Sequence, residues 1–229
     1  MKKILHIVLI LVAVSLSTQG FSQKIRVACI GNSITAGYGL QNPEHEAYPA
    51  ALQNLLDKKY HNYTNLFEVK NFGISARTLL MKGDLPWMKE PFFRDVLNYN
   101  PNYIIIKLGT NDTKPHNWKY GDEFQKDLET MIAILQSLPS NPRIILCYPI
   151  PVYENEWGIR DEILVSDIIP IITRVANNNG FAIVDLHSNM AKNLYLQDNV
   201  HPNIEGSKVI AEKIFNSVFD NIEIVTEKE

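Results

Sequence analysis

The sequence has few cysteines and no block of charge of one sign. Its 229 residues include two cysteines, Cys29 and Cys147, and its formal net charge is -3. Both cysteines fall in predicted buried strands, where cysteine usually packs as a small hydrophobic residue, so we expect two free thiols. The slightly acidic balance argues against a basic surface for nucleic acid and against binding to an anionic membrane.

Long apolar runs are also missing, apart from one near the N-terminus. Residues 4–16 are almost wholly apolar, with Lys2 and Lys3 before them and small or polar residues after them. This order is typical of a secretory signal peptide, and the run is short for a membrane span. We therefore expect residues 1–23 to be removed and the mature protein to be exported, periplasmic or secreted, without stable membrane insertion. An uncleaved membrane anchor is the alternative.

Two patterns of other site types are absent. The sequence contains no GxSxG, which argues against the nucleophile elbow of α/β-hydrolases. His45, His61 and His116 are scattered without metal-ligand spacing. We therefore predict no metal site and no cofactor.

The chain has instead the composition of an ordinary globular domain, with 45% apolar and 21% charged residues. Five apolar runs of strand length alternate with stretches of helical period. The expected strands cover residues 25–30, 66–72, 103–108, 143–148 and 181–186. The expected helices begin at Tyr48 or cover residues 91–98, 122–138, 159–177 and 203–219, with a kink near Pro170 and an N-cap at Asn203.

Such alternation predicts an α/β fold, a three-layer α/β/α sandwich around a five-stranded parallel sheet with right-handed crossovers. The sequence has no linker and no second composition regime. We therefore expect one domain over residues 24–220, followed by a C-terminal tail over residues 221–229.

Polar turns follow three of the expected strands. Ser33 follows the first, Gly73 the second and Asn111 the third. The carboxyl ends of parallel strands lie at one edge of the sheet, so these residues can converge there. A serine nucleophile also needs a base, and His201 with Asp198 offers one from the far end of the chain.

Each of these residues also has a purely structural interpretation. Ser33 can cap a helix, Gly73 can serve a backbone turn, and Asn111 can bond its own loop. His201 can be a surface residue before a helix. Asp185 remains a substitute acid for His201, whereas Ser75 has no evident partner.

Four sequence blocks together resemble the SGNH, or GDSL-like, hydrolase superfamily. They are GNSIT with Ser33, NFGIS with Gly73, GTND with Asn111 and DNVHPN with His201, in the order of the family. The resemblance implies a flavodoxin-like strand order, 2-1-3-4-5, which separates the strands of the two cysteines. The chain departs from the family at Asn32, where Asp is usual, and we interpret this as a subgroup variant whose amide can still bond the turn.

The resemblance also implies a role for each residue. Ser33 would attack an acyl carbonyl, His201 would take and return the proton, and Asp198 would orient the imidazole ring. The backbone N–H groups of Ser33 and Gly73 and the side-chain amide of Asn111 would form the oxyanion hole.

The expected substrate is a small-molecule or glycan ester. Residues 77–84 and 114–118 resemble members of the superfamily that are known as carbohydrate or sialate O-acetylesterases. We expect Arg77 and Trp118 to contact the substrate. Four aromatic residues in predicted loops either border a sugar pocket or pack internally. They are Trp87, Trp118, Tyr153 and Trp157.

The leading hypothesis is an exported serine esterase that removes small acyl groups, above all acetyl, from carbohydrates through an acyl-enzyme. The sequence shows no long apolar lid of the kind expected for a lipase. Lysophospholipase or thioesterase action at the same site is the alternative hypothesis. A catalytically inactive carbohydrate-binding module is a third.

Overall fold

A computed structural model describes residues 24–63 and 65–222, so the expected signal peptide and most of the expected tail lie outside the described residues. The core is a five-stranded sheet with the order β2-β1-β3-β4-β5, in which every pair is parallel. The strands are β1 Ile25–Gly31, β2 Phe67–Gly73, β3 Tyr103–Lys107, β4 Arg143–Cys147 and β5 Ala182–Val184. The predicted fold and strand order are confirmed.

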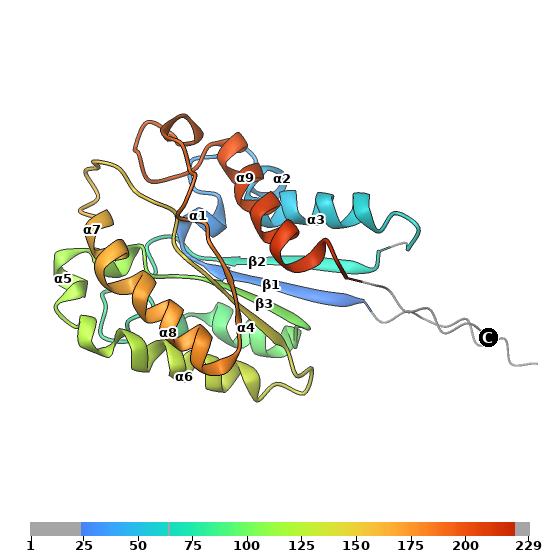
Figure 1. The fold of residues 1–229 in the computed structure, drawn as a ribbon, viewed down its shortest axis with the longest axis horizontal. Helices are drawn as coiled ribbons and strands as arrows, with labels where there is room; N and C mark the ends of the chain where they lie inside the picture. Colours follow the sequence, from blue (N-terminus) through green and yellow to red (C-terminus); the bar gives the residue numbers. More distant parts are fainter. Residues whose placement is uncertain (1–23, 64, 223–229) are drawn as a thin grey trace, which may run out of the picture.

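Helices cover both faces of the sheet, which gives the three predicted layers (Figure 1). On one face lie α3 Tyr48–Lys59 and α9 Ile204–Ile214, and on the other lie α4 Pro91–Tyr99, α6 Phe124–Gln136 and α8 Ile169–Asn179. Alternate residues of β1 enter different cores, because successive strand side chains point to opposite faces. Ala28 and Ile30 pack in one core, and Val27 and Cys29 pack in the other.

Shorter elements connect this frame. The remaining α-helices are α1 Ser33–Ala36, α2 Pro43–Glu46, α5 Pro115–Trp118 and α7 Asp161–Ile163. Single 3₁₀ turns occur at Trp87–Lys89, Asn111–Thr113, Gly121–Glu123 and Lys192–Leu194.

The helix predicted over residues 159–177 is interrupted, but not by a simple kink. A π-helical segment, Leu164–Ile168, stands between α7 and α8, and Pro170 lies in the first turn of α8. Proline has no N–H for the carbonyl four residues earlier, so the regular ladder cannot continue through this point. A second π-helical segment, Phe215–Phe219, extends α9. The cap predicted at Asn203 is present, since its side chain accepts from Gly206 N at 2.9 Å.

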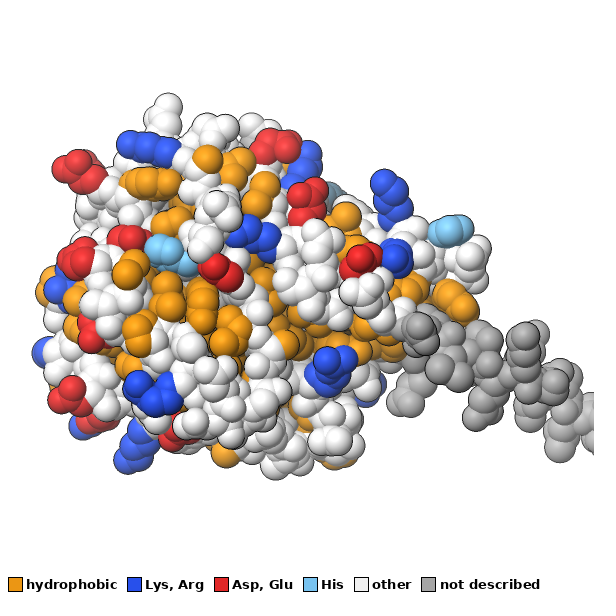
Figure 2. Space-filling model, viewed as in Figure 1, with side chains coloured by type: hydrophobic (Ala, Val, Ile, Leu, Met, Phe, Trp, Pro, Cys, Tyr) orange, Lys and Arg blue, Asp and Glu red, His pale blue; other side chains and the backbone are white. Residues whose placement is uncertain are grey.

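The surface carries both signs of charge. On the face seen in Figure 2, acidic and basic side chains are interspersed and no single basic patch stands out. No helix among residues 24–63 and 65–222 has the length and apolar character needed to span a bilayer.

Two cysteines and one lysine are buried in the strands of the sheet. The thiols of Cys29 and Cys147 are free, as predicted, and burial raises the pKa of Cys147 to about 12. Lys107, at the end of β3, is fully buried, and its ammonium nitrogen has no hydrogen-bond partner within the described part of the chain. Burial lowers the pKa of Lys107 to about 7.

We predict that Lys107→Met changes how stability depends on pH. The unfolded chain keeps the Lys107 proton up to the ordinary pKa of 10.5, whereas the folded chain releases it at about 7. Between these values the unfolded state binds more protons, so this residue makes the wild type more stable as the pH rises. The free energy of unfolding of the wild type, minus that of the variant, should increase by on the order of 4 kcal/mol across this window.

Urea unfolding of both proteins at several pH values between 6 and 10 would measure this difference, because the other titrating groups are common to both. Parallel stability curves would contradict a depressed Lys107 pKa.

Candidate active site

The turn after β1 presents Ser33 at the first position of α1. Asn32 caps this short helix, and its Oδ1 accepts from Ile34 N at 3.1 Å. Gly31 is required before it, because a Cβ there would lie 2.0 Å from Thr35 Oγ1. The amide at position 32 therefore supplies the cap that a carboxylate would supply. Its Nδ2 is buried without a partner among the described residues.

Ser33, His201 and Asp198 form one hydrogen-bonded chain. His201 Nε2 lies 2.8 Å from Ser33 Oγ, and His201 Nδ1 lies 2.6 Å from Asp198 Oδ2. The other carboxylate oxygen of Asp198 accepts from the backbone N–H groups of Val200 and His201, each at 3.0 Å. A carboxylate on Nδ1 favours the tautomer with its proton on Nδ1, which leaves Nε2 to accept from the serine.

Burial determines the charge state of this group of residues. It lowers the pKa of His201, and the neighbouring Asp198 carboxylate only partly opposes the shift. Burial alone would raise the pKa of Asp198, but the two backbone N–H groups and the His201 ring lower it. At neutral pH, His201 is therefore neutral beside an ionised Asp198, as a general base requires.

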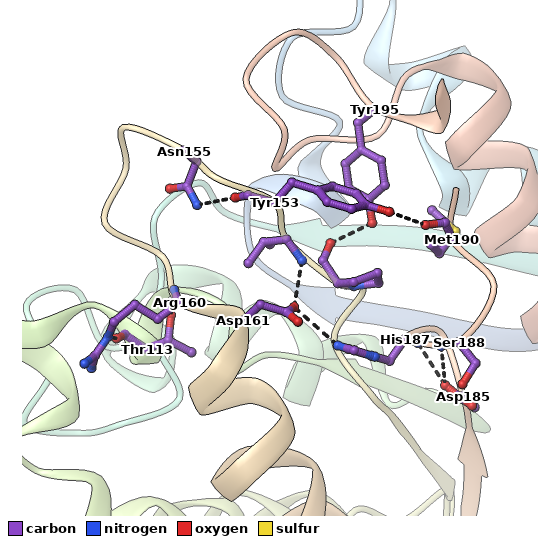
Figure 3. A network of polar contacts seen from close by, with 12 residues as sticks. Thr113, Tyr153, Asn155, Arg160, Asp161, Asp185, His187, Ser188, Met190 and Tyr195 are labelled. Atoms are coloured by element: carbon purple, nitrogen blue, oxygen red, sulfur yellow. Dashed lines mark hydrogen bonds and ion pairs between the residues drawn. The ribbon is translucent and has the colours of Figure 1, made fainter. Parts of the chain in front are cut away.

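The substitute acid, Asp185, has a different task. Its Oδ1 accepts from the backbone N–H groups of His187 and Ser188, both at 2.9 Å. His187 in turn directs Nε2 toward Asp161 Oδ1 at 3.3 Å (Figure 3). Asp185 thus holds the turn after β5, and Asp198 is the carboxylate that contacts His201.

The expected oxyanion donors differ in availability. No hydrogen bond within the described residues engages the Ser33 N–H at the start of α1. Asn111 Nδ2 uses one of its two N–H bonds on Arg77 O at 3.1 Å, which leaves the second. The Gly73 N–H, by contrast, donates to Asn71 Oδ1 at 2.8 Å, so it is already occupied.

Gly73 is nevertheless needed where it stands. A Cβ on this residue would lie 2.2 Å from Ala36 N, so only glycine lets the end of β2 approach α1 so closely. Asn71 Nδ2 donates to Thr35 O at 2.8 Å and ties the two elements together. In this structure Gly73 positions the serine turn.

Two residues expected to bind substrate do not line the pocket at Ser33. The Arg77 guanidinium is bound to Glu90, at 2.9 Å from Nε and 2.8 Å from Nη2, and its Nη1 donates to Ser75 O at 2.8 Å. Trp118 borders a separate hollow and packs against Phe124 with ring centroids 5.9 Å apart. Both side chains have structural partners elsewhere, and their contact with substrate stays a prediction.

The other three aromatic residues of the predicted loops differ in whether they reach the Ser33 pocket. Trp87 is fully buried in the core, and the Tyr153 hydroxyl donates to Met190 O at 2.9 Å. Trp157 alone of the four borders the Ser33 pocket, and its ring meets the His201 ring edge-on with centroids 6.0 Å apart.

The pocket at Ser33 has a volume of about 80 Å³. The lining includes four residues that were not predicted for the site, Tyr38, Ala76, Lys114 and Ile159. The Tyr38 ring packs on His201 with centroids 4.6 Å apart. The sequence did hold a signal for it, since Gly37 and Gly39, both at positive φ, bracket this aromatic just after the nucleophile turn.

Comparison with known proteins agrees with this geometry. Residues 29–209 match the family described as GDSL-like Lipase/Acylhydrolase family. The chain belongs to this family.

Among the described residues, no three His, Cys, Asp or Glu side chains come together as a metal site would require.

Two curated relatives of the GDSL-like chain are esterases by name. An acetylxylan esterase of Xylanibacter ruminicola is 44% identical over 209 residues, which are 83% of this chain and 42% of that protein. A multidomain esterase of Ruminococcus flavefaciens is 26% identical over 115 residues, or 48% of this chain and 15% of that protein. The chain therefore spans less than half the length of these relatives.

Solved structures share the fold. The crystal structure of the acetyl xylan esterase AlAXEase is 25% identical with a TM-score of 0.66, and the match covers 85% of this chain and 100% of that one. The native aryl esterase of M. smegmatis is 17% identical with a TM-score of 0.64, and covers 85% and 100%. The second likeness shows the fold alone.

We predict that Asp198→Asn lowers kcat by about 10³–10⁴-fold, because an amide on Nδ1 disfavours the required tautomer. The wild-type rate should fall with acid only below pH 6.5, since burial lowers the pKa of His201 from that value. Loss of the Asp198 charge lowers this pKa further, so the acid limb of the variant should move to lower pH.

Asp185→Asn is the matched control and should retain near wild-type turnover. The pH profile of kcat/KM on p-nitrophenyl acetate, measured for the wild type, Asp198→Asn and Asp185→Asn, checks these expectations. The assignment of the acid would be wrong if Asp185→Asn lost activity and Asp198→Asn did not.

Proposed function

We propose that this chain is a serine carboxylic ester hydrolase that removes acetyl groups from carbohydrates. The observation that carries the proposal is the hydrogen-bonded chain from Ser33 through His201 to Asp198. The 44% identity to a protein named acetylxylan esterase supports the substrate class.

The first half of the reaction forms an acyl-enzyme. Ser33 Oγ attacks the ester carbonyl as its proton passes to His201 Nε2. Asp198 stabilises the resulting imidazolium. The negative charge on the carbonyl oxygen is held by the Ser33 N–H and by the Asn111 amide.

The first half ends when the imidazolium of His201 gives its proton to the departing sugar oxygen, which leaves as an alcohol and leaves the acyl group on Ser33. The second half returns the enzyme to its starting state. A water attacks the Ser33 ester while His201 takes one of its protons. Collapse of the intermediate releases the carboxylic acid and returns the proton to Ser33 Oγ.

The size of the pocket at Ser33 favours acetyl over longer acyl groups. Its volume of about 80 Å³ is far below the ~300–1,000 Å³ typical of sites for drug-sized ligands. Tyr38, Trp157 and Ile159 stand on its border. A lysophospholipase would need a longer apolar channel than these residues leave.

Exposed aromatic faces beside the nucleophile favour a sugar as the alcohol part. Tyr38 and Trp157 are each 45% exposed although both rings pack near His201. A flat aromatic face offers apolar contact to the C–H surface of a sugar ring. We also propose that the protein acts outside the cytoplasm, because residues 1–23 have the order of a signal peptide.

The test compares acyl length and natural substrates. Hydrolysis of p-nitrophenyl esters should be fastest with acetate and fall as the acyl chain lengthens, and acetylated xylan should release acetate. Ser33→Ala should lower kcat by roughly 10⁴–10⁶-fold, because the nucleophile is removed.

Two results would contradict the proposal. A preference for long acyl chains would replace it with lysophospholipase or thioesterase action. Absence of a phenol burst in the wild type, with sugar binding equal in the wild type and Ser33→Ala, would indicate an inactive carbohydrate-binding module.

A further inference from the structure

A larger hollow opens beside the pocket at Ser33. Its volume is about 790 Å³. It is lined by residues 154–157, after β4, and by Lys192 and residues 197–199, before α9. Trp157 borders both this hollow and the Ser33 pocket, and Asp198 of the catalytic chain lies in its wall. The hollow is therefore a continuation of the active site, within the ~300–1,000 Å³ range of ligand sites.

One half-buried amide fixes the shape of the first wall. Asn155 Oδ1 accepts from Trp157 N at 3.0 Å and from Ile159 N at 3.2 Å. Its Nδ2 donates to Tyr153 O at 2.8 Å (Figure 3) and also to Ile159 O at 2.9 Å. With all its polar positions used inside the loop, Asn155 holds Trp157 in place before a ligand arrives.

The two walls are also bound to each other. Asn199 Nδ2 donates to Glu154 O at 2.8 Å, and Tyr153 N donates to Asn199 O at 3.1 Å. Tyr153 and Tyr195 pack edge to face beneath them, with ring centroids 5.3 Å apart. The hollow is thus a built feature and not a gap between loose loops.

The chemistry of the lining indicates an uncharged, hydroxyl-rich ligand. Glu154, Glu156 and Asp198 place three carboxylates around the hollow, against the single cation of Lys192. Carboxylates accept hydrogen bonds from sugar hydroxyls but repel a ligand that carries carboxylates of its own. Trp157, 45% exposed, adds an apolar face for a sugar ring.

We propose that this hollow binds the main chain of a neutral polysaccharide, next to the acetylated sugar, and excludes glycans that carry acidic groups. The inference rests on the proposed acetylesterase function and adds to it the charge and length of the substrate. Acetylated xylo-oligosaccharides fit this description, and O-acetylated sialic acids do not. Acetylated sialic acids should therefore be poor substrates, although residues 77–84 and 114–118 resemble family members known as sialate O-acetylesterases.

The first experiment measures length dependence. The kcat/KM of the wild type should rise from acetylated xylose to acetylated xylotetraose, because only the longer sugar enters the hollow. Trp157→Ala should raise KM for the tetraose by about 3–10-fold, through loss of the aromatic contact. Equal kcat/KM for both sugars in the wild type would overturn the proposal.

The second experiment reverses the charge of the wall. The double variant Glu154→Lys, Glu156→Lys should shift the ratio of kcat/KM for an acetylated uronic-acid oligosaccharide over that for acetylated xylotetraose by about tenfold toward the acidic substrate. Glu162→Lys, an exposed charge reversal outside the hollow, is the matched control and should leave the ratio as in the wild type. An unchanged ratio in the double variant would overturn the proposal.

Hydrolysis of p-nitrophenyl acetate separates the two possible failures. This ester is too small to need the hollow, so its turnover reports on the Ser33 centre. If the wild type hydrolysed neither this ester nor acetylated xylan, the proposed function itself would fail. If both were hydrolysed without dependence on sugar length or charge, only the inference about the hollow would fail.

Discussion

The hydrogen bond between Ser33 Oγ and His201 Nε2 joins residues 168 positions apart in the sequence, and it depends on the fold to bring them together. The parallel sheet sends every strand toward the same edge, so the turn after β1 and the loop before α9 meet there. The two side chains stay within hydrogen-bond distance because other residues hold each of them in position. Asn32 caps the serine turn, and Asp198 holds the imidazole through its ring and its backbone.

Close backbone packing supports the serine turn from the other side. Gly31 and Gly73 face each other across β1 and β2, and neither position has room for a Cβ. Replacement of either glycine by a larger residue would push α1 away from the strand ends and lengthen the bond from Ser33 to His201. Gly73, at the end of β2, therefore affects the distance between Ser33 and His201, even though Asn71 occupies its N–H.

The sequence was sufficient for elements with a strong local signal. Continuous apolar runs marked the five strands, and the polar turns after them marked Ser33, Gly73 and Asn111. The block DNVHPN before the last helix marked His201. The sequence did not predict the position of a side chain on a loop that is held by residues far away in the chain. Arg160 binds Thr113 through its Nε, at 2.7 Å from the carbonyl oxygen (Figure 3). Asn199 binds Glu154 across 45 positions. Those bonds bring Trp157, and not Trp118, to the pocket, and no local pattern encodes them.

The buried cation near the site links acid–base behaviour to the architecture. Positive charge on Lys107 and Lys114 lowers the pKa of His201 beyond the effect of burial. Lys107 itself gains its proton at about pH 7, so acidification adds positive charge close to the imidazole as the imidazole would otherwise begin to protonate. The two titrations oppose each other, which keeps His201 neutral further into acid than Asp198 alone would allow. A lysine without a partner is costly in a core, and at this position its cost is coupled to the protonation of the base.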